Sequence, residues 1–334
     1  MVSLSFLDQS PAIEGVPHTE TIRETVAYAR ACEAMGFHRY WLAEHHNSLA
    51  NIGTAPEILV AAIAATTSRI RVGSAGVLLS HYAPLKVAEQ FRVLEALAPG
   101  RIDLGLGRSP GGSEIAAKAL RRGTPPEFDL AVAELLDWLM DAGHSDHPGV
   151  QALPTTPGQP EPWILSSSPR GAALAAKMGL PYCFNISHGQ NHHQADEAVA
   201  YFRTHYRPSA RFPQPLLSLA VWALAADSDD EARFLYGPRA LWRVQLDRGV
   251  RSGLLSPDQI TKLTFTDEEQ QRIDHTLSYS FVGSAARVGR QLDALIARHQ
   301  PDELVMTCWT HDAKDRQRSC ALVAQQLGVA KGET

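Results

Sequence analysis

Cysteine is scarce in this chain of 334 residues, and its four copies never form a C-x-x-C pair. Zinc ribbons, dithiol redox motifs and disulfide scaffolds need closely spaced cysteines, so this spacing argues against all three. We expect the four to be buried and to behave as small apolar side chains, at Cys32, Cys183, Cys308 and Cys320.

The sequence also lacks long apolar runs and an excess of positive charge. No stretch of about 18 apolar residues occurs, which argues against a membrane-spanning helix. The N-terminal segment has no basic region followed by a cleavage site. The formal net charge is -5, so nothing in it attracts nucleic acid or anionic lipid. We therefore expect a cytoplasmic protein whose partners are small molecules, without a nucleic-acid or membrane partner.

What the sequence does have is a regular alternation of short apolar runs and amphipathic stretches, the pattern of βαβ units. Near-continuous apolar runs are typical of parallel strands covered on both faces. Strands are predicted at residues 2–7, 39–43, 70–77, 101–106, 162–166, 181–185, 216–225 and 303–308. No G-x-G-x-x-G turn follows the first run, which disfavours a Rossmann domain. We therefore predict an α/β protein, a single (β/α)8 TIM barrel over residues 1–334.

Two connections are longer than a barrel repeat needs. They are residues 143–162, rich in proline, glycine and histidine, and residues 248–278. Long connections within enzymes often form lids, and both are expected near the barrel mouth. Thr54 and Ser284 each precede a stretch with helical character and are predicted N-caps.

Polar residues crowd the end of the second predicted strand, where residues 41–47 read WLAEHHN. The carboxyl ends of barrel strands form active sites, so Glu44, His45 and His46 are candidates for function. A metal site, a proton-transfer or substrate-binding site, and a structural cluster are all compatible with this run. The spacing H-E-x-x-H is absent, so a metal is the least favoured and none is predicted. Because side chains alternate along a strand, we expect only one histidine to face the mouth.

A serine-rich segment, LSSSPRG at residues 165–171, leads from the fifth strand into a helix that begins at Pro169. N–H groups and hydroxyls at a helix N-terminus bind anions, most often phosphate. An ordinary N-cap is the alternative, and it needs only one serine. Arg108 and Arg170 are available to neutralise a bound phosphate.

Glycines mark two further strand ends. The run GSAG at residues 73–76 lies within the third strand, where small residues often indicate a bulge or the close approach of a flat ligand. The run GLGRSPGG at residues 105–112 follows the fourth strand. It is compatible with a plain tight turn and with a loop where an anionic ligand reaches the backbone beside Arg108.

Five ordered stretches resemble the bacterial luciferase-like monooxygenases, a flavin-dependent superfamily with a TIM-barrel fold. They are GFHRYWLAEHHN, RIRVGSAGVLLSHYAPLKVAEQF, LAPGRIDLGLGRSPG, SSSPRGAALAAKMGLP and FVGSAARVGRQLDAL. The resemblance extends over nearly the whole chain and implies an FMN site assembled from these stretches.

The resemblance also implies roles for individual residues. It places His45 beside the reactive edge of the flavin, as a catalytic residue together with Glu44, and His46 nearby. The implied cofactor contacts are a bulged platform with a cis peptide bond between Ala75 and Gly76, phosphate ligands Arg108, Ser167, Ser168 and Gly171, and a flavin contact at Asn185. The luciferase catalytic subunit has a reactive cysteine after strand four, where this chain has Gly107. Light emission and long-chain aldehyde oxidation are therefore not implied.

The activity that the resemblance implies is oxygenation of a small organic substrate by O2 and FMNH2, with FMNH2 supplied by a separate flavin reductase. An aromatic natural-product intermediate, an aldehyde and a sulfur compound all remain open as substrates. We expect the substrate pocket to be bounded by Asp8 and Ser10, by the connection that follows strand four, by Trp222 if it faces inward, and by the 248–278 connection. Deazaflavin-dependent hydride transfer and non-catalytic flavin binding are the alternatives. Family members commonly pair through helices two and three, so a homodimer is expected.

Overall fold

Eight parallel strands close into a ring in the computed structural model, which describes residues 2–121, 124, 126–140, 146–188 and 192–329. Around the ring the order is β1-β2-β3-β4-β5-β6-β7-β9, and β9 pairs with β1. The strands are β1 (Ser3–Asp8), β2 (Arg39–Leu42), β3 (Arg71–Leu78), β4 (Ile102–Gly107), β5 (Glu161–Ser166), β6 (Tyr182–Asn185), β7 (Leu217–Ala226) and β9 (Glu303–Thr307). Each lies within one residue of its predicted bounds, and the predicted (β/α)8 barrel is confirmed.

One further strand, β8 (Phe281–Ser284), was not predicted from the sequence. It pairs in parallel with the last four residues of β7, outside the closed ring. Only its first two residues are large and apolar, so the strand is too short to give a periodic pattern.

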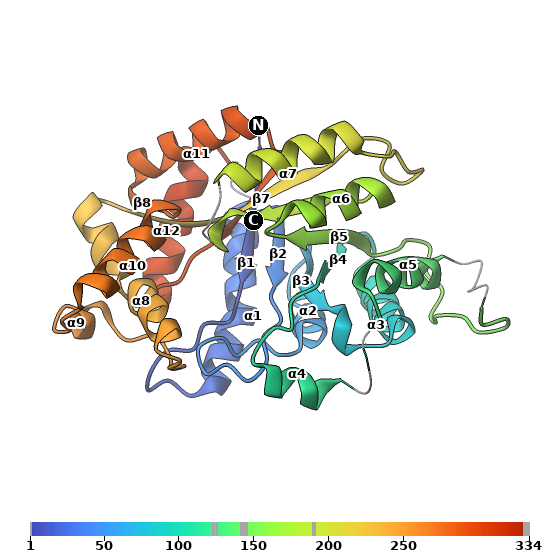
Figure 1. Ribbon diagram of the computed structural model, residues 1–334, viewed down its shortest axis with the longest axis horizontal. Helices are drawn as coiled ribbons and strands as arrows, with labels where there is room; N and C mark the ends of the chain where they lie inside the picture. The colour runs from blue at the N-terminus through green and yellow to red at the C-terminus, as the bar shows by residue number, and fades with distance from the viewer. Residues whose placement is uncertain (1, 122–123, 125, 141–145, 189–191, 330–334) are drawn as a thin grey trace.

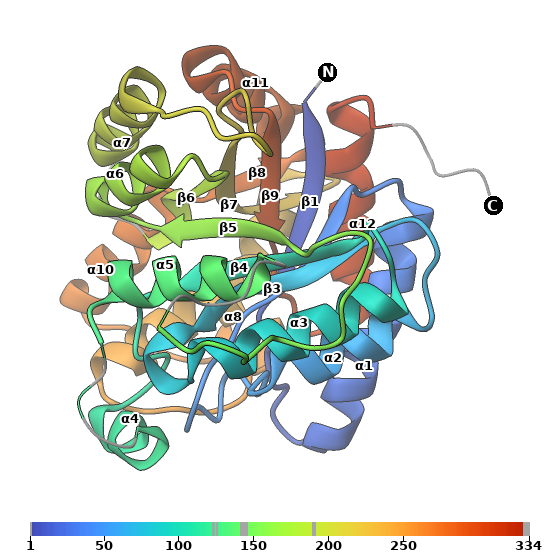
Figure 2. The same cartoon turned by 90° about the vertical axis from the view of Figure 1, so that its right-hand side faces the viewer.

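Helices surround the ring on all sides (Figures 1 and 2). In Figure 2, the neighbouring helices α1, α2 and α3 lie side by side along one flank. The bounds are α1 (His18–Ala34), α2 (Pro56–Ala64), α3 (Pro84–Leu97), α4 (Glu114–Leu120), α5 (Phe128–Leu139), α6 (Pro169–Met178), α7 (His192–His205), α8 (Asp229–Asp247), α9 (Pro257–Ile260), α10 (Asp267–Ser278), α11 (Ala285–His299) and α12 (Ala313–Gln326). Two 3-10 turns, η1 (Leu79–His81) and η2 (Ile186–His188), follow β3 and β6. Within the described residues, no helix is long and apolar enough to cross a membrane.

The two long connections differ in structure. Residues 146–160, between α5 and β5, contain no helix or strand. The 248–278 connection contains α9 and α10, and each of these helices begins with a capping box, at Ser256 and Thr266. The predicted N-cap Thr54 is wrong, because α2 begins at Pro56 after Ala55. Ser284 does immediately precede α11, although its side chain makes no capping hydrogen bond.

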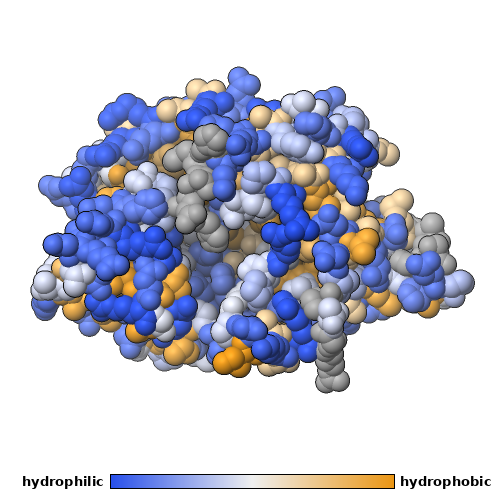
Figure 3. All heavy atoms as spheres, viewed as in Figure 1, coloured by the Kyte–Doolittle hydropathy of each residue, from blue (hydrophilic) through white to orange (hydrophobic). Residues whose placement is uncertain are grey.

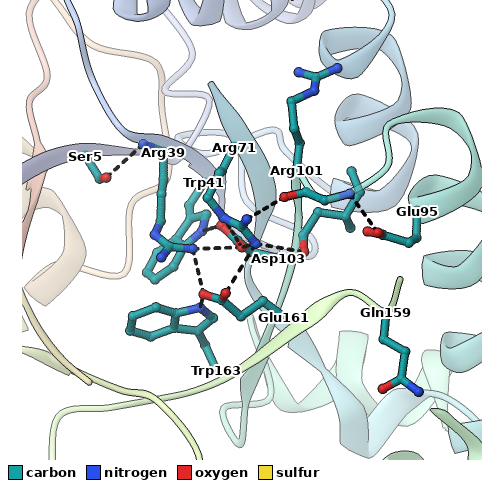
Figure 4. Close-up of polar contacts among 12 residues, drawn as sticks. Ser5, Arg39, Trp41, Arg71, Glu95, Arg101, Asp103, Gln159, Glu161 and Trp163 are labelled. Carbon is teal, nitrogen blue, oxygen red and sulfur yellow. Dashed lines mark hydrogen bonds and ion pairs between the residues drawn. The ribbon is translucent and has the colours of Figure 1, made fainter. Parts of the chain in front are cut away.

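A charged cluster fills the barrel interior at the amino ends of the strands (Figure 4). Arg39 Nη1 donates to Asp103 Oδ1 at 2.8 Å and to Glu161 Oε1 at 2.9 Å, and Arg39 Nε donates to Glu303 Oε2 at 3.0 Å. Arg71 Nε donates to the same Asp103 oxygen at 2.9 Å. Burial alone would raise the pKa of Asp103, but the charges of Arg39 and Arg71 outweigh it and lower that pKa.

Above the charged cluster lies an apolar layer inside the ring. Its buried members are Leu7, Trp41, Ala43, Trp163, Cys183, Ala220 and Val305. The indole N–H groups of Trp41 and Trp163 donate down to Asp103 and Glu161, which joins the two layers. All four cysteines are buried and unbridged, as expected. Together the layers close the lower half of the barrel, so space for a ligand is left at the carboxyl ends of the strands.

Candidate active site

A cavity of about 1040 Å³ opens at the carboxyl ends of the strands. Its volume is at the upper end of the range for pockets that hold cofactors and drug-sized ligands. Figure 3 shows one face of the molecule, mostly hydrophilic and hollowed near its centre. All the predicted site residues line the cavity, namely Glu44, His45, Ala75, Gly76, Arg108, Ser167, Ser168, Gly171 and Asn185.

The run that follows β2 does not continue as a strand. Because β2 ends at Leu42, the alternation of side chains stops before this run, and both His45 and His46 line the cavity. The alternation on which we based the expectation of a single histidine facing the mouth therefore does not apply here. The backbone N–H of His45 donates to Gly53 O at 2.9 Å, and that of His46 donates to Gly111 O at 2.8 Å. These bonds tie the run to the loops on both sides of it.

Glu44 is buried and its carboxylate has three partners. Tyr82 Oη donates to Oε1 at 2.6 Å, the backbone N–H of Leu78 donates to Oε2 at 2.9 Å, and His46 Nε2 lies 2.7 Å from Oε1. Burial, and then the hydrogen bond to Glu44, raise the pKa of Tyr82, so its hydroxyl stays protonated and keeps donating. Glu44 thus orients His46 and holds the end of β3, and its oxygens are occupied by these contacts.

The end of β3 is irregular, as the glycine-rich run predicted. The peptide bond between Ala75 and Gly76 is cis, and the pairing of β3 with β4 shifts register between Ser74 and Val77. A Cβ at Gly76 would lie 2.6 Å from the carbonyl oxygen of Gly105, so only glycine fits beside β4. The backbone therefore bends at Ala75 and Gly76, and this part of the cavity wall has no bulky side chain.

The serine-rich segment leaves the N-terminus of α6 without a side-chain cap. Ser168 occupies the N-cap position, yet its hydroxyl makes no capping hydrogen bond. Instead, Ser166 Oγ accepts from the N–H of Ser168 at 2.9 Å and donates to its carbonyl at 2.9 Å. A Cβ at Gly171 would lie 2.2 Å from Ser166 Cβ, so glycine lets the first turn of α6 pack on this serine. The first-turn N–H groups of α6 therefore have no side-chain acceptor at the N-cap.

Two arginines extend into this part of the cavity. Arg108 follows β4, and Arg170 lies in the first turn of α6. Both are exposed and line the cavity, and the only ion pair of Arg170 within the described residues is a 3.9 Å contact with Glu127. Exposed pairs of this kind contribute little, so Arg170 can turn toward a bound anion. On the neighbouring strand, Asn185 Oδ1 accepts from the N–H and hydroxyl of Ser187, which fixes Asn185 at the end of β6.

The substrate side of the cavity differs from the sequence expectation. Asp8 and Ser10 are buried and do not line it; Asp8 accepts from the N–H of Ser10 at 2.6 Å and contacts Tyr40 and Arg316. Their neighbours Leu7 and Gln9 line it instead. Trp222 lines the cavity as predicted, and the 248–278 connection contributes Gly249 and Arg251.

Sequence reasoning missed a group of residues in the same wall, namely Arg239, Trp242 and Trp309. The spacing of Arg239 and Trp242, three apart in α8, was the available signal, because it places both on one helix face. No group of three or more histidine, cysteine, aspartate or glutamate side chains is arranged to hold a metal ion in the part of the chain that the structure describes.

Comparison with known proteins agrees with this geometry. The family model described as luciferase-like monooxygenase matches residues 2–299. The chain belongs to the luciferase-like monooxygenase family. A luciferase-like monooxygenase of Escherichia coli strain K12 is 36% identical over 327 residues, which are 96% of each chain. The N-acetyl-S-alkylcysteine monooxygenase of Bacillus subtilis strain 168 is 32% identical over 336 residues, which are 99% of this chain and 100% of that one.

Solved structures give the same result. The structure of apo-MsnO8 superposes with a TM-score of 0.89 at 34% identity and covers 99% of this chain and 100% of its own. Two more distant members of the luciferase-like fold share the barrel alone. An oxygenating constituent of 3,6-diketocamphane monooxygenase from Pseudomonas putida, solved with FMN, is 18% identical with a TM-score of 0.68 and 97% of each chain covered. An F420-dependent secondary alcohol dehydrogenase is 11% identical with a TM-score of 0.66, covering 100% of this chain and 99% of that one.

Proposed function

We propose that this luciferase-like protein is an FMNH2-dependent monooxygenase that oxygenates a small organic substrate. One observation carries the proposal: the N-terminus of α6, which has no side-chain cap, lines the same cavity as Arg108, His45 and the Ala75–Gly76 bend. A phosphate site, a narrow glycine-lined wall and an ionisable side chain are the features that a flavin mononucleotide needs.

The residues present fit FMN. Ser167, Arg108 and the first-turn N–H groups of α6 would hold the phosphate, since a helix N-terminus and a guanidinium both favour a dianion. The bend at Ala75 and Gly76 would support the flat ring, because it presents no bulky side chain. When bound as FMNH2, the cofactor would supply the electrons that activate O2 for transfer of one oxygen atom.

His45 is the residue that we propose to hold or move a proton. An imidazole ordinarily titrates near pH ~6.5, which suits proton transfer near neutrality. General acid–base catalysis of this kind is typically worth about 10²–10⁴ in rate. We reassign Glu44 from a catalytic role to a positioning role, because Tyr82, Leu78 and His46 already occupy its oxygens.

The electron donor in this proposal is a separate flavin reductase, and the location is the cytoplasm. The barrel lacks the glycine-rich nicotinamide motif, so it needs FMNH2 from another protein. The substrate is a small organic molecule. The relative named N-acetyl-S-alkylcysteine monooxygenase makes a sulfur compound one candidate, beside aldehydes and aromatic natural-product intermediates.

Titration of the purified protein with FMN, riboflavin and the deazaflavin F420 tests the cofactor. FMN should bind at least tenfold more tightly than riboflavin, which lacks the phosphate, and Arg108→Gln should reduce that preference. Tight binding of F420 with none of FMN would instead support deazaflavin-dependent hydride transfer.

Oxygen uptake in the presence of a flavin reductase and NADH tests the activity. With a range of thioethers, aldehydes and phenols, at least one should raise product formation from 18O2 above the free-flavin background. FMN binding without any oxygenated product would support a non-catalytic flavin-binding protein and refute the monooxygenase proposal.

We also propose a homodimer formed through α2 and α3. Three apolar side chains on these helices are exposed to solvent, namely Ile58 and Leu97 at 66% each and Val93 at 46%. The two helices lie side by side (Figure 2), so these residues share one flank of the barrel. Apolar patches of this kind favour burial against a partner. Light scattering should give a dimer mass, and a monomer mass would contradict the proposal.

A further inference from the structure

The cavity has a second wall that the cofactor proposal does not use. It is built by Arg239 and Trp242 on α8, Trp222 on β7 and Trp309, which follows β9. β5, which leads into α6, is separated from β7 by one strand and from β9 by two around the ring. The wall of Arg239 therefore follows other strands of the barrel mouth than the proposed phosphate site does.

Arg239 is a buried cation surrounded by tryptophan. Only 6% of its surface is exposed. Its guanidinium carbon lies 4.3 Å from the ring centroid of Trp242, 5.0 Å from that of Trp309 and 5.9 Å from that of Trp222. Cation–π contacts of this kind stabilise a guanidinium, but they satisfy none of its N–H donors.

No carboxylate balances this charge among the described residues. Of the four arginines that are buried there, Arg39 and Arg316 pair with acidic side chains and Arg92 donates to backbone carbonyls. Arg239 has no hydrogen bond or ion pair to any described residue, and its Nε is buried without an acceptor. Burial lowers the pKa of Arg239 to about 10, so it remains a cation at neutral pH.

The neighbouring donors are also unpartnered. The indole Nε1 atoms of Trp222 and Trp309 are buried without an acceptor within the described chain. A buried cation without a counter-charge is unfavourable, and unpaired N–H groups make the wall less favourable still. Arg243 pairs with Asp247, and Arg251 donates to two backbone carbonyls at the exposed rim. Arg239 is thus the buried cation that lacks an acceptor, and it lines the cavity.

We propose that the substrate carries a carboxylate that Arg239 binds, with its apolar body packed against Trp222, Trp242 and Trp309. The proposal rests on the monooxygenase function above and names its substrate class. A single guanidinium matches the two oxygens of one carboxylate, and the aromatic surroundings favour an apolar substrate body. A phosphate dianion would call for a second unpaired cation beside Arg239, but Arg243, which also lines the cavity, pairs with Asp247.

The first test compares a carboxylic acid with its amide on the wild-type protein. Calorimetric titration with 3-phenylpropionate and with 3-phenylpropanamide is carried out with and without saturating FMN. The acid should bind at least tenfold more tightly than the amide, since a hydrogen bond to a charged group contributes more than one to a neutral group. Equal affinity of acid and amide would overturn the proposal.

Three variants test whether Arg239 causes the preference for the acid over the amide. Arg239→Gln should lose at least tenfold in affinity for the acid and little for the amide, and Arg239→Lys should keep part of the preference. Arg251→Gln is the matched control, because it removes an exposed cation from the same cavity. If Arg251→Gln loses as much as Arg239→Gln, the preference reflects general charge and the proposal fails. If Arg239→Gln does not fold, the wild-type comparison and Arg239→Lys decide.

The results distinguish a failure of the monooxygenase proposal from a failure of the carboxylate proposal. FMN affinity should be unchanged within about twofold in Arg239→Gln, because Arg239 lies on α8, whereas the proposed phosphate ligands follow β4 and β5. If the wild-type protein binds no FMN yet prefers the acid without it, the monooxygenase proposal fails and carboxylate recognition stands. If FMN binds and oxygenation occurs with no acid preference, the carboxylate proposal alone is wrong.

Discussion

Replacing Glu44 by alanine separates a positioning role from a catalytic one. The carboxylate accepts from Leu78 N–H at 2.9 Å and from Tyr82 Oη at 2.6 Å, and it lies 2.7 Å from His46 Nε2. Leaving a buried donor unsatisfied costs about 1–3 kcal/mol, and the substitution removes the acceptor of the Leu78 N–H. Tyr82 and His46 are only partly buried and can turn to water. We therefore expect Glu44→Ala to lower the free energy of unfolding by about 2–4 kcal/mol.

The assay is urea denaturation followed by fluorescence, together with FMN titration. Tyr82→Phe removes one of the three contacts and should cost about 0.5–1.5 kcal/mol. The double variant should cost less than the sum of the two, because both changes delete the same hydrogen bond. FMN should also bind about tenfold more weakly to Glu44→Ala, since Glu44 holds the end of β3 beside Ala75 and Gly76.

Glu57→Ala is the matched control. Glu57 is a half-buried carboxylate on α2 near the same site, and its hydrogen bond with Gln90 is long, at 3.4 Å. Its removal should lower the free energy of unfolding by less than about 1 kcal/mol. If Glu44→Ala keeps the stability and FMN affinity of the wild type but abolishes oxygenation, Glu44 is catalytic and the positioning argument is refuted.

Three further predictions follow from the described contacts. His45→Ala should keep FMN affinity and lower product formation at least about tenfold, and wild-type turnover would exclude the proton-transfer role. Gly171→Ala should weaken FMN binding at least about tenfold in a fluorescence titration, because its Cβ would lie 2.2 Å from Ser166 Cβ and displace the first turn of α6. The pKa of Asp103 is lowered in the folded state. Its contribution to the free energy of unfolding is therefore fully present above the unfolded pKa of about 4, and is lost as the pH falls below that value. Asp103→Asn should therefore destabilise the protein at pH 7 and flatten its loss of stability in acid, and an unchanged acid limb in pH-dependent melting would contradict this.

The barrel could be predicted because its signal is local. Buried parallel strands read as apolar runs, and each run stands directly in the sequence. β8 was not predicted, because Phe281 and Val282 are followed directly by Gly283 and the apolar run is too short to indicate a strand. Thr54 was misplaced as an N-cap because Pro56 begins α2 one residue later than the pattern indicated, and Pro at the first position fixes that start.

The sequence identified residues that line the cavity, but not the partners of those residues. WLAEHHN, GSAG and SSSPRG identified the side chains that line the cavity. The contacts of Glu44 with Leu78 and Tyr82 join residues 34 and 38 positions apart. No local pattern encodes such pairs, because they depend on how β2 and β3 align. That is why the sequence alone suggested a catalytic role for Glu44, whereas its contacts lead us to propose a positioning role.

The same limit applies to the buried arginines. Arg39 and Arg239 are exposed by only 4% and 6%, and each stands near tryptophan side chains. Arg39 has three carboxylates within 3.0 Å, contributed by strands that are distant in the sequence, so its charge is balanced within the protein. Arg239 has none among the described residues. A buried charge needs a counter-charge. The chain supplies it to Arg39 at the closed end of the barrel. At the open end, we propose that the carboxylate of the substrate supplies it to Arg239.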